Sequence, residues 1–394
     1  MTIPSFRFFN PVKIISGEKA LDSLGYELKQ LGAKHPLIVS DQGVAAAGLV
    51  TLVKEALNKA GILSDILFDQ VPPDSSPQVV DQAAGMFREH NCDSIVSVGG
   101  GSVIDTGKAV NIVVTEGVDS LAELAGVKLH KPMRPFIAIP TTSGTGSEVT
   151  YAAMIRDAAQ NKKLLFASYL LFPKTAILDP RMTVSLPPLV TAATAMDAMT
   201  HAIEACICKP RNPFSDAHSI GAIKLIRKYL PLVLNNSDDR EARFYLANAA
   251  CMAGAAFSNA GVGLIHALGH ALGGVCQVPH GIAMNILLPH GLEYNLPAVG
   301  EIIGELLLPL AGPEKYIETP AKDRPQKTIA SLREIKDDLY KTTGLPRTLT
   351  EAGVEKAALG EIAQKAVKDP ALAFNPLSAS FESVLEILNK AHKP

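Results

Sequence analysis

Two domains of different class are predicted for this chain: an α/β domain with a parallel sheet over residues 1–186, and an all-helical domain over residues 187–394. The 394 residues exceed the roughly 250–300 over which one hydrophobic core usually grows. The first half alternates short β-rich runs with helix-like segments. The second half is rich in Ala, Leu and Met at helical periodicity, with few convincing strands.

The elements of both halves follow from the spacing of apolar residues. In the first half we predict strands at 36–40, 62–66, 94–98, 135–139 and 175–178, and helices at 44–60, 77–90 and 102–115. This alternation favours a parallel sheet with helices on both faces. In the second half we predict helices at 189–208, 214–235, 239–259, 262–273, 280–291, 297–311, 325–343, 355–367 and 379–392.

Composition and charge exclude several classes of protein. The net charge is −2 and no basic or acidic run is present, so we expect neither a nucleic-acid partner nor a membrane surface. No segment approaches the roughly 18 uninterrupted apolar residues of a membrane-spanning helix. The five cysteines form no C-x-x-C pair, which is typical of reduced thiols. We therefore expect a soluble, cytoplasmic protein.

An aspartate and four histidines lie in three short blocks of the second half. Asp197 and His201 are four residues apart, as are His266 and His270, so each pair shares one face of a helix. His280 follows in a third block. A carboxylate with imidazoles is a ligand set that Fe²⁺ or Zn²⁺ accepts. Helical spacing alone does not decide whether His270 or His280 completes such a site.

A glycine-rich turn directly follows the predicted strand 94–98. Gly99–Gly101 lack the side chains that would hold the backbone away from a diphosphate. A helix that begins at Ser102 would direct its N–H groups at the same anion. The alternative is a plain turn in which Ser102 and Asp105 form a capping box.

A second loop suited to phosphate follows the next predicted strand. Residues 140–150 contain six hydroxyl side chains and two glycines. In an open parallel sheet, ligands bind beyond the carboxyl ends of the strands, where both loops would open. The order of motifs differs from the ordinary Rossmann fingerprint, because the acid Asp41 comes two strands before the glycines. On spacing alone, Asp41 is better explained as a helix cap.

Together these motifs resemble those of the iron-containing, or group III, alcohol dehydrogenase family over nearly the whole chain. The matching segments are 40–43, 99–108, 140–148, 195–204, 266–274, 279–281, 287–289 and 375–376. The resemblance implies a dehydroquinate synthase-like architecture, with a non-classical, Rossmann-like nucleotide-binding domain, an all-helical domain and a catalytic cleft between them. It also implies NAD as cofactor, Fe²⁺ or alternatively Zn²⁺ as metal, and a small alcohol or aldehyde as substrate.

The resemblance also implies roles for individual residues. A carboxylate at Asp41 would accept hydrogen bonds from the adenosine ribose and repel the 2′-phosphate of NADP, which favours NAD. His270 would lie near the nicotinamide and relay a proton, and we predict Asp105 as a second catalytic residue. The expected metal ligands are Asp197, His201, His266 and His280. The expected cofactor-binding residues are Asp41, Gly99, Gly100, Gly101, Ser102, Thr141, Thr142, Thr145, Ser147 and Lys163. The expected substrate pocket contains Tyr151, Phe257 and Val262.

The predicted activity is a metal-dependent, NAD(H)-linked alcohol dehydrogenase for short-chain alcohols, including diols such as 1,2- or 1,3-propanediol. The first alternative is a zinc enzyme similar to glycerol dehydrogenase. A lyase similar to dehydroquinate synthase is disfavoured, because segments 189–206 and 254–285 contain no Lys or Arg for an acidic, phosphorylated substrate. A third alternative is a metal-binding assembly protein without turnover.

The N-terminal run 6–15 is apolar and strand-like. Proteins similar to this one often pair through such a strand, so we expect a homodimer or a higher homo-oligomer. The alternative is an edge strand of the first domain.

Overall fold

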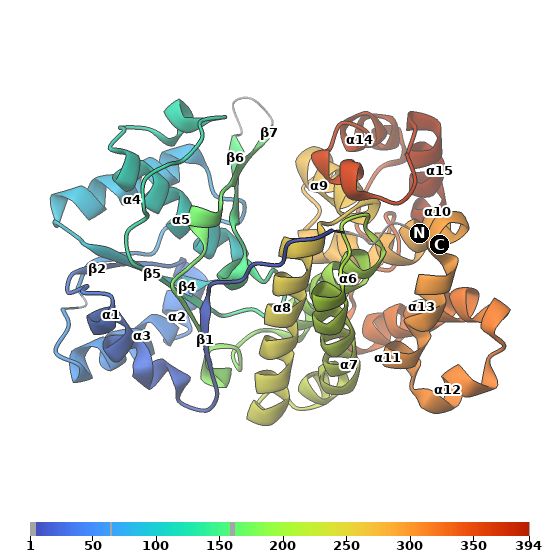
Figure 1. Cartoon of the computed structure of the whole chain (residues 1–394), viewed down its shortest axis with the longest axis horizontal. Helices are drawn as coiled ribbons and strands as arrows, with labels where there is room; N and C mark the ends of the chain where they lie inside the picture. The colour runs from blue at the N-terminus through green and yellow to red at the C-terminus, as the bar shows by residue number, and fades with distance from the viewer. Residues whose placement is uncertain (1–4, 64, 158–161, 394) are drawn as a thin grey trace. The chain divides into compact units, whose positions relative to one another are not determined.

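The computed structural model describes residues 5–63, 65–157 and 162–393 (Figure 1). It divides into two compact units. An α/β unit comprises Asn10–Leu186 and Asp238–Asn248, and a helical unit comprises Met1–Phe9, Pro187–Ser237 and Ala249–Pro394.

The segment 238–248 belongs to the α/β unit, whereas the sequence analysis placed it in the helical domain. Its buried Arg243 donates to the backbone oxygens of Val184 and Leu186, which explains the assignment. The first turns of α8 (Arg240–Ala260) therefore pack with the unit that precedes them in sequence.

A six-stranded parallel sheet forms the centre of the α/β unit (Figure 1). Its strands are β1 (Lys13–Ser16), β2 (Pro36–Val39), β3 (Leu67–Phe68), β4 (Ser94–Gly99), β5 (Phe136–Pro140) and β8 (Thr175–Leu178). They lie in the order β1–β8–β5–β4–β2–β3, and all neighbours are parallel. Because parallel strands end at one edge, the residues that follow β2, β4 and β5 share that edge; Gly99 pairs with Pro140 there.

Helices cover both faces of this sheet, as predicted. They are α1 (Leu24–Gln30), α2 (Gln42–Ala46), α3 (Leu49–Lys59), α4 (Pro77–Glu89) and α5 (Gly101–Glu116). One buried cluster joins Leu37 and Val39 to α4 and α5, and another joins Ile38 to α1 and α3. Successive residues of β2 thus point to opposite faces, and both faces are apolar, as is typical of a buried parallel strand.

Two predicted elements of this unit are partly wrong. The strand expected at 62–66 lies at Leu67–Phe68, because the N–H of Ile62 bonds to the oxygen of Leu57 and closes the end of α3. The helix expected at 44–60 is divided into α2 and α3 at Gly48, whose φ of 78° lies in the left-handed region.

An antiparallel pair of strands, β6 (Ala152–Asp157) and β7 (Lys162–Ala167), was not predicted. Its residues are mostly small or charged, so its alternation is weak in the sequence. The buried Lys108 of α5 supports it, since Nζ donates to the backbone oxygens of Thr150 at 3.0 Å and Ala152 at 2.7 Å. Burial lowers the pKa of Lys108 to about 8.

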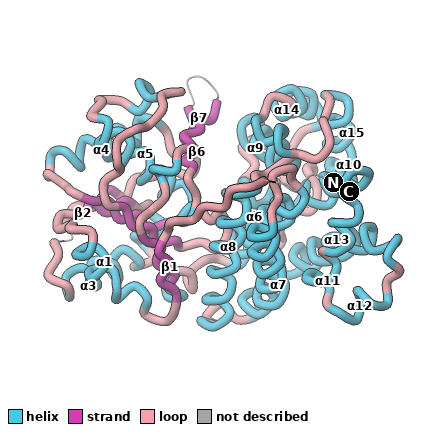
Figure 2. Tube along the Cα trace, in the orientation of Figure 1, coloured by secondary structure: helices cyan, strands magenta, loops and turns pink. Residues whose placement is uncertain are grey.

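The second unit is helical, as Figure 2 shows. Its helices are α6 (Pro188–Ile207), α7 (Pro213–Asn235), the latter part of α8, α9 (Leu264–Cys276), α10 (His280–Glu305), α11 (Leu307–Ala311), α12 (Pro313–Glu318), α13 (Arg324–Thr343), α14 (Leu359–Ala366) and α15 (Phe381–His392). From Thr191 to Ile207 every residue of α6 except Thr194 is buried. This helix packs against α7 and α10, so the side chains that it carries are held in the core.

Two helix boundaries in this unit differ from prediction. The helix that carries His270 continues through Gly273–Gly274 and ends at Cys276, because the chain turns only at Gln277, where φ is 57°. The helices expected at 280–291 and 297–311 are replaced by a long α10, bent at Val299, and a short α11.

The N-terminal run 6–15 forms a strand only at Lys13–Ser16, which is an edge strand of the sheet. Residues 5–9 belong to the helical unit, where the N–H of Phe9 donates to Asn259 Oδ1 at 2.7 Å. Phe6 and Phe8 lie against Phe214, with ring centroids 5.9 and 5.5 Å apart.

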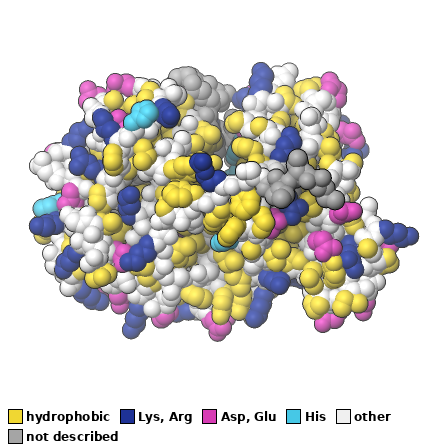
Figure 3. Space-filling model, viewed as in Figure 1, with side chains coloured by type: hydrophobic (Ala, Val, Ile, Leu, Met, Phe, Trp, Pro, Cys, Tyr) yellow, Lys and Arg dark blue, Asp and Glu magenta, His cyan; other side chains and the backbone are white. Residues whose placement is uncertain are grey.

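Within the described residues, no single helix is long and apolar enough to span a membrane; α8 and α9 meet that criterion only as a pair bent by 105°. On the face drawn in Figure 3, basic and acidic side chains are interspersed. This distribution agrees with the net charge of −2.

Candidate metal centre and cofactor loops

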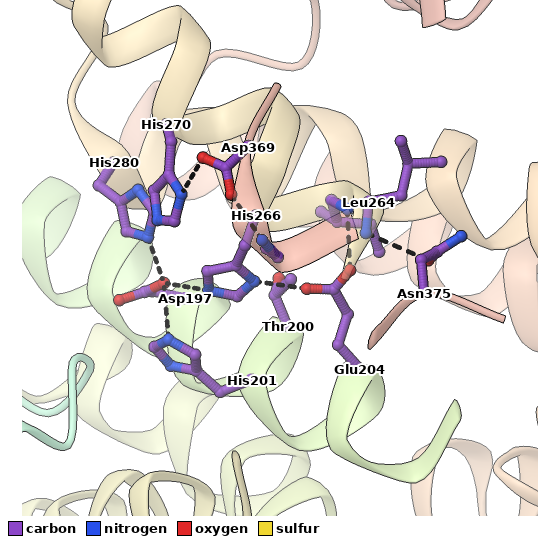
Figure 4. Close-up of polar contacts among 12 residues, drawn as sticks. Asp197, Thr200, His201, Glu204, Leu264, His266, His270, His280, Asp369 and Asn375 are labelled. Carbon is purple, nitrogen blue, oxygen red and sulfur yellow. Dashed lines mark hydrogen bonds and ion pairs between the residues drawn. The ribbon is translucent and has the colours of Figure 1, made fainter. Parts of the chain in front are cut away.

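Three helices bring four ligand-type side chains together (Figure 4). Asp197 and His201 come from α6, His266 from α9 and His280 from the first position of α10. Oδ1 of Asp197 lies 3.8, 3.8 and 3.3 Å from the Nε2 atoms of His201, His266 and His280. One ligand atom from each residue lies within 4.8 Å of the others. Helical spacing left His270 and His280 as alternatives, and the structure brings His280 into the cluster.

The cluster has the properties of a cation site. Asp197, His201 and His266 are buried. Oδ1 of Asp197 and Nε2 of His266 find no hydrogen-bond partner outside the cluster among the described residues. A buried polar atom without a partner costs about 1–3 kcal/mol. A divalent cation bound by nitrogen and oxygen would satisfy both atoms, so the residues fit Fe²⁺ or Zn²⁺.

Burial and mutual charge favour the protonation states that a metal ion requires. Burial lowers the pKa of His201 to about 3 and holds the pKa of His266 well below its ordinary value. Burial would raise the pKa of Asp197, but His201 and His280 outweigh it and hold that pKa well below its usual range. Neutral imidazoles and an ionised carboxylate are the forms that bind metal ions.

A buried carboxylate that the sequence analysis missed supports the cluster. Oε2 of Glu204 lies 2.5 Å from Nδ1 of His266, and Oε1 accepts the N–H of Ile265 at 2.8 Å. Burial raises the pKa of Glu204 to about 7. The sequence held a signal for it, because Glu204 follows Asp197 by seven residues and so shares its helix face.

His270, the predicted proton relay, lies beside the cluster. Its Nδ1 is 2.9 Å from Oδ2 of Asp369, and its ring stacks on His280 at 5.6 Å. Burial would raise the pKa of Asp369, but its hydrogen bond with His270 and the charge of that histidine lower it. Asp369 was also missed, and its separation of 99 residues from His270 leaves no local signal in the sequence.

The three predicted pocket residues fall in different units. Phe257 stacks on His201 with ring centroids 4.2 Å apart, and Val262 lies half-buried in the turn between α8 and α9. Tyr151 belongs to the α/β unit, where its ring lies 5.4 Å from Tyr169 and 5.8 Å from Phe172.

In the α/β unit, the two predicted phosphate loops lie against each other. Gly99 ends β4, Gly100 is the N-cap of α5, and that cap position has no side-chain hydrogen bond. A Cβ on Gly101 would lie 2.7 Å from Cγ2 of Thr145, and one on Gly100 would lie 3.3 Å from Cγ2 of Thr142. The glycines therefore permit the close approach of the two loops. They also leave the first N–H groups of α5 without a capping side chain, so these groups are available to bind an anion.

Ser102 and Asp105 do not form the capping box that was considered as an alternative. Oγ of Ser102 accepts the N–H of Asp74 at 3.3 Å. Oδ2 of Asp105 accepts the N–H of Met154 at 2.9 Å, and Oδ1 lies 3.9 Å from Nζ of Lys108. These contacts join α5 to β6 and favour a structural role for Asp105, so its catalytic role stays a prediction.

The remaining cofactor candidates lie in or near the same edge loops. Asp41 follows β2 and caps α2, its Oδ1 accepting the N–H of Val44 at 2.8 Å. Thr141 and Ser147 are buried in the loop after β5. Lys163 lies in β7, but its side chain is outside the part of the chain that the structure describes.

Comparisons with known proteins cover both units. The family described as iron-containing alcohol dehydrogenase matches residues 11–180, and the C-terminal region of the Fe-containing alcohol dehydrogenase family matches residues 191–392. The NAD-dependent methanol dehydrogenase of Bacillus methanolicus is 37% identical over 385 residues, covering 98% of this chain and 99% of that protein.

Solved structures agree with this family assignment. A 1,3-propanediol oxidoreductase superposes with a TM-score of 0.93 at 34% identity, covering 98% of this chain and 100% of that chain. A sulfoacetaldehyde reductase from Bifidobacterium kashiwanohense, solved in complex with NAD⁺, superposes with a TM-score of 0.87 at 26% identity, covering 98% and 99%.

Proposed function

Since the chain belongs to the iron-containing alcohol dehydrogenase family, we propose that it is an NAD(H)-linked, metal-dependent dehydrogenase of short-chain alcohols and a reductase of the corresponding aldehydes. The observation that carries this proposal is the buried cluster of one carboxylate and three imidazoles. With one acid among its four side chains, this ligand set would leave a divalent cation with net positive charge. That charge suits the oxygen of an alcohol that is losing its proton.

The proposed metal ligands are Asp197, His201, His266 and His280. When bound, Fe²⁺, or alternatively Zn²⁺, would supply Lewis-acid chemistry at the substrate oxygen. Burial keeps His201 and His266 neutral, and the neighbouring histidines keep Asp197 ionised. The ring of His201 is also held against Phe257. The arrangement also limits the solvent that reaches the three buried ligands.

His270 is the proposed route for the proton released from the alcohol. Its bond to Asp369 engages Nδ1, which leaves Nε2 free to accept a proton. The side chain is 25% exposed, so a proton can pass on to water.

The proposed NAD site uses the edge of the parallel sheet. The uncapped start of α5 and the loop 140–150 would bind the diphosphate through N–H and hydroxyl groups. Asp41 would accept hydrogen bonds from the adenosine ribose, and its carboxylate would repel the 2′-phosphate of NADP. The groups proposed to contribute are Gly99, Gly100, Gly101, Ser102, Thr141, Thr142, Thr145, Ser147 and Lys163.

The proposed substrates are alcohols and aldehydes of a few carbons, including 1,2- and 1,3-propanediol. The apolar side chains of Phe257 and Val262, and the absence of Lys and Arg from 254–285, support a neutral substrate. The similar proteins described above include a methanol dehydrogenase and a 1,3-propanediol oxidoreductase. The alcohols in their names have one and three carbons, which agrees with a small substrate.

A panel of aldehydes tests the substrate class. NADH oxidation by the metal-loaded protein should proceed with propanal and lactaldehyde at kcat/KM values well above those for a phosphorylated or dicarboxylic aldehyde. A preference for the charged aldehydes would contradict the proposal. Oxidation of glycerol as the preferred alcohol, with Zn²⁺ as the most active metal, would instead support the glycerol dehydrogenase-like alternative.

We also propose a homo-oligomer, with a dimer as the smallest form, in the cytoplasm. The edge strand β1 and the exposed Phe6, Phe9 and Ile14 support association through the N-terminal segment. The five cysteines are free thiols, which supports a reducing compartment.

A further inference from the structure

We propose that Glu204 is a positioning residue for the metal centre, which fixes both the ring tautomer of His266 and the start of the helix that carries it. The inference rests on the proposed metal site and extends it to a residue that binds no metal. Glu204 is fully buried, and its two carboxylate oxygens have different partners.

The first function is to hold the tautomer. Oε2 of Glu204 lies 2.5 Å from Nδ1 of His266, while Nε2 of the same ring faces Oδ1 of Asp197 at 3.8 Å. A carboxylate that accepts a hydrogen bond from Nδ1–H leaves the lone pair of Nε2 directed at the cluster. The opposite tautomer would place a hydrogen on Nε2 and block its use as a ligand. The acceptor behind the ring thus determines which nitrogen is available.

The second function is to fix the first turn of α9. The N-cap of this helix is Gly263, which has no side chain to cap the first N–H groups. Those groups are bound from elsewhere: Oδ1 of Asn375 accepts from Leu264 at 3.1 Å, and Oε1 of Glu204 accepts from Ile265 at 2.8 Å. His266 is the next residue, so the same carboxylate restrains the backbone and the ring of this ligand.

The glycine at the N-cap is required for this arrangement. A Cβ on Gly263 would lie 2.7 Å from Oδ1 of Asn375 and 3.3 Å from Oε1 of Glu204. An ordinary capping side chain would therefore displace both distant caps. The helix α9 thus has no capping side chain of its own at Gly263. One of the two residues that cap it instead, Glu204, also contacts the proposed ligand His266.

The variant Glu204→Gln tests the proposal, because glutamine has nearly the same shape but one acceptor instead of two. If its oxygen keeps the N–H of Ile265, its amide N–H₂ faces Nδ1 of His266 and favours the tautomer that cannot bind metal. We expect metal affinity to fall by about 10- to 100-fold, the usual effect of losing such a supporting partner. The measurement is competition between the chelator-stripped protein and a calibrated chelator for Co²⁺, with the visible spectrum of bound Co²⁺ as a second readout of ligand geometry.

Asn375→Ala is the matched control. It removes the other cap of α9 but contacts none of the four proposed ligands, so it should lower the thermal midpoint and leave Co²⁺ affinity within a few-fold of wild type. The proposal is overturned if Glu204→Gln binds Co²⁺ like wild type, or if Asn375→Ala loses as much affinity as Glu204→Gln. The variant Asp197→Asn distinguishes a failure of the proposed metal site from a failure of the positioning role of Glu204. If wild type does not bind Co²⁺, or if Asp197→Asn binds it equally well, the proposed metal site itself fails.

Discussion

Two histidines near the candidate centre have the same kind of partner but different exposure. His266 is bonded to Glu204 and His270 to Asp369, in each case through Nδ1. The side chain of His266 is 3% exposed, whereas that of His270 is 25% exposed. A buried imidazole with a free Nε2 is suited to a cation, and a partly exposed one is suited to proton exchange with water. For these two histidines the difference in exposure agrees with the proposed roles, whereas the more exposed His280 is placed among the ligands by its 3.3 Å distance from Oδ1 of Asp197.

Asp369→Asn should lower kcat/KM on the order of tenfold, because it replaces one charge-assisted hydrogen bond to His270 worth about 1.5 kcal/mol. The asparagine oxygen can keep the cap on the N–H of Ala371, which the carboxylate provides at 2.9 Å, so thermal stability should change little. Steady-state kinetics with NADH and an aldehyde measure the effect. In a His270→Ala background the same substitution should have no further effect; a second tenfold loss there would show that Asp369 acts by another route.

Helical spacing predicted the residue types of the candidate ligands and three of their four positions, Asp197, His201 and His266. Spacing orders residues around one helix, but it does not say which helices converge, so His270 and His280 could not be separated without tertiary structure. Glu204 could have been found, since it shares the face of Asp197 and His201. Asp369 could not, because it meets His270 only through the packing of a distant short helix against α9.

The start of α5 is the element on which the proposed cofactor site depends most. Gly101→Ala should raise the Kd for NADH about tenfold, because the new Cβ would lie 2.7 Å from Cγ2 of Thr145 and force the two loops apart. Isothermal titration calorimetry with NADH measures the change. Gly85→Ala, in α4, is the control: its Cβ meets nothing within 4 Å, so NADH affinity should hold and stability should rise by about 0.5–1 kcal/mol. Unchanged NADH affinity in Gly101→Ala would remove this loop from the cofactor site.

The long helices and the strands β2, β4, β5 and β8 were predicted well, whereas the two-residue strand, the antiparallel pair and the interrupted helices were not. The helices α4, α5, α6, α7 and α13 lie within a residue or two of their predicted bounds. The two-residue strand β3 is fixed by pairing with β2, which lies far from it in the sequence. The strands β6 and β7 pair with each other, and their support from the buried Lys108 of α5 is a tertiary contact that a local pattern does not show. The glycines in α9 are helical because they lie within a helix that is packed against α10 and α14, a tertiary effect that overrides their low propensity.

Across the whole chain, the chemistry is divided between the two units. All four proposed metal ligands belong to the helical unit, and the proposed diphosphate loops belong to the α/β unit. We therefore expect hydride transfer between NADH and an aldehyde to depend on both sets of residues. The family matches extend over both units.

The most direct test of the account is NADH oxidation by propanal with chelator-stripped protein, assayed anaerobically with and without added Fe²⁺. His280→Ala is the informative variant, because this ligand is 34% exposed and its loss opens no buried cavity. We expect the stripped wild type to bind NADH without turnover and to recover activity with Fe²⁺, while His280→Ala binds NADH equally well and does not recover. Full activity of the stripped protein, or equal recovery in His280→Ala, would contradict a metal centre at these four residues.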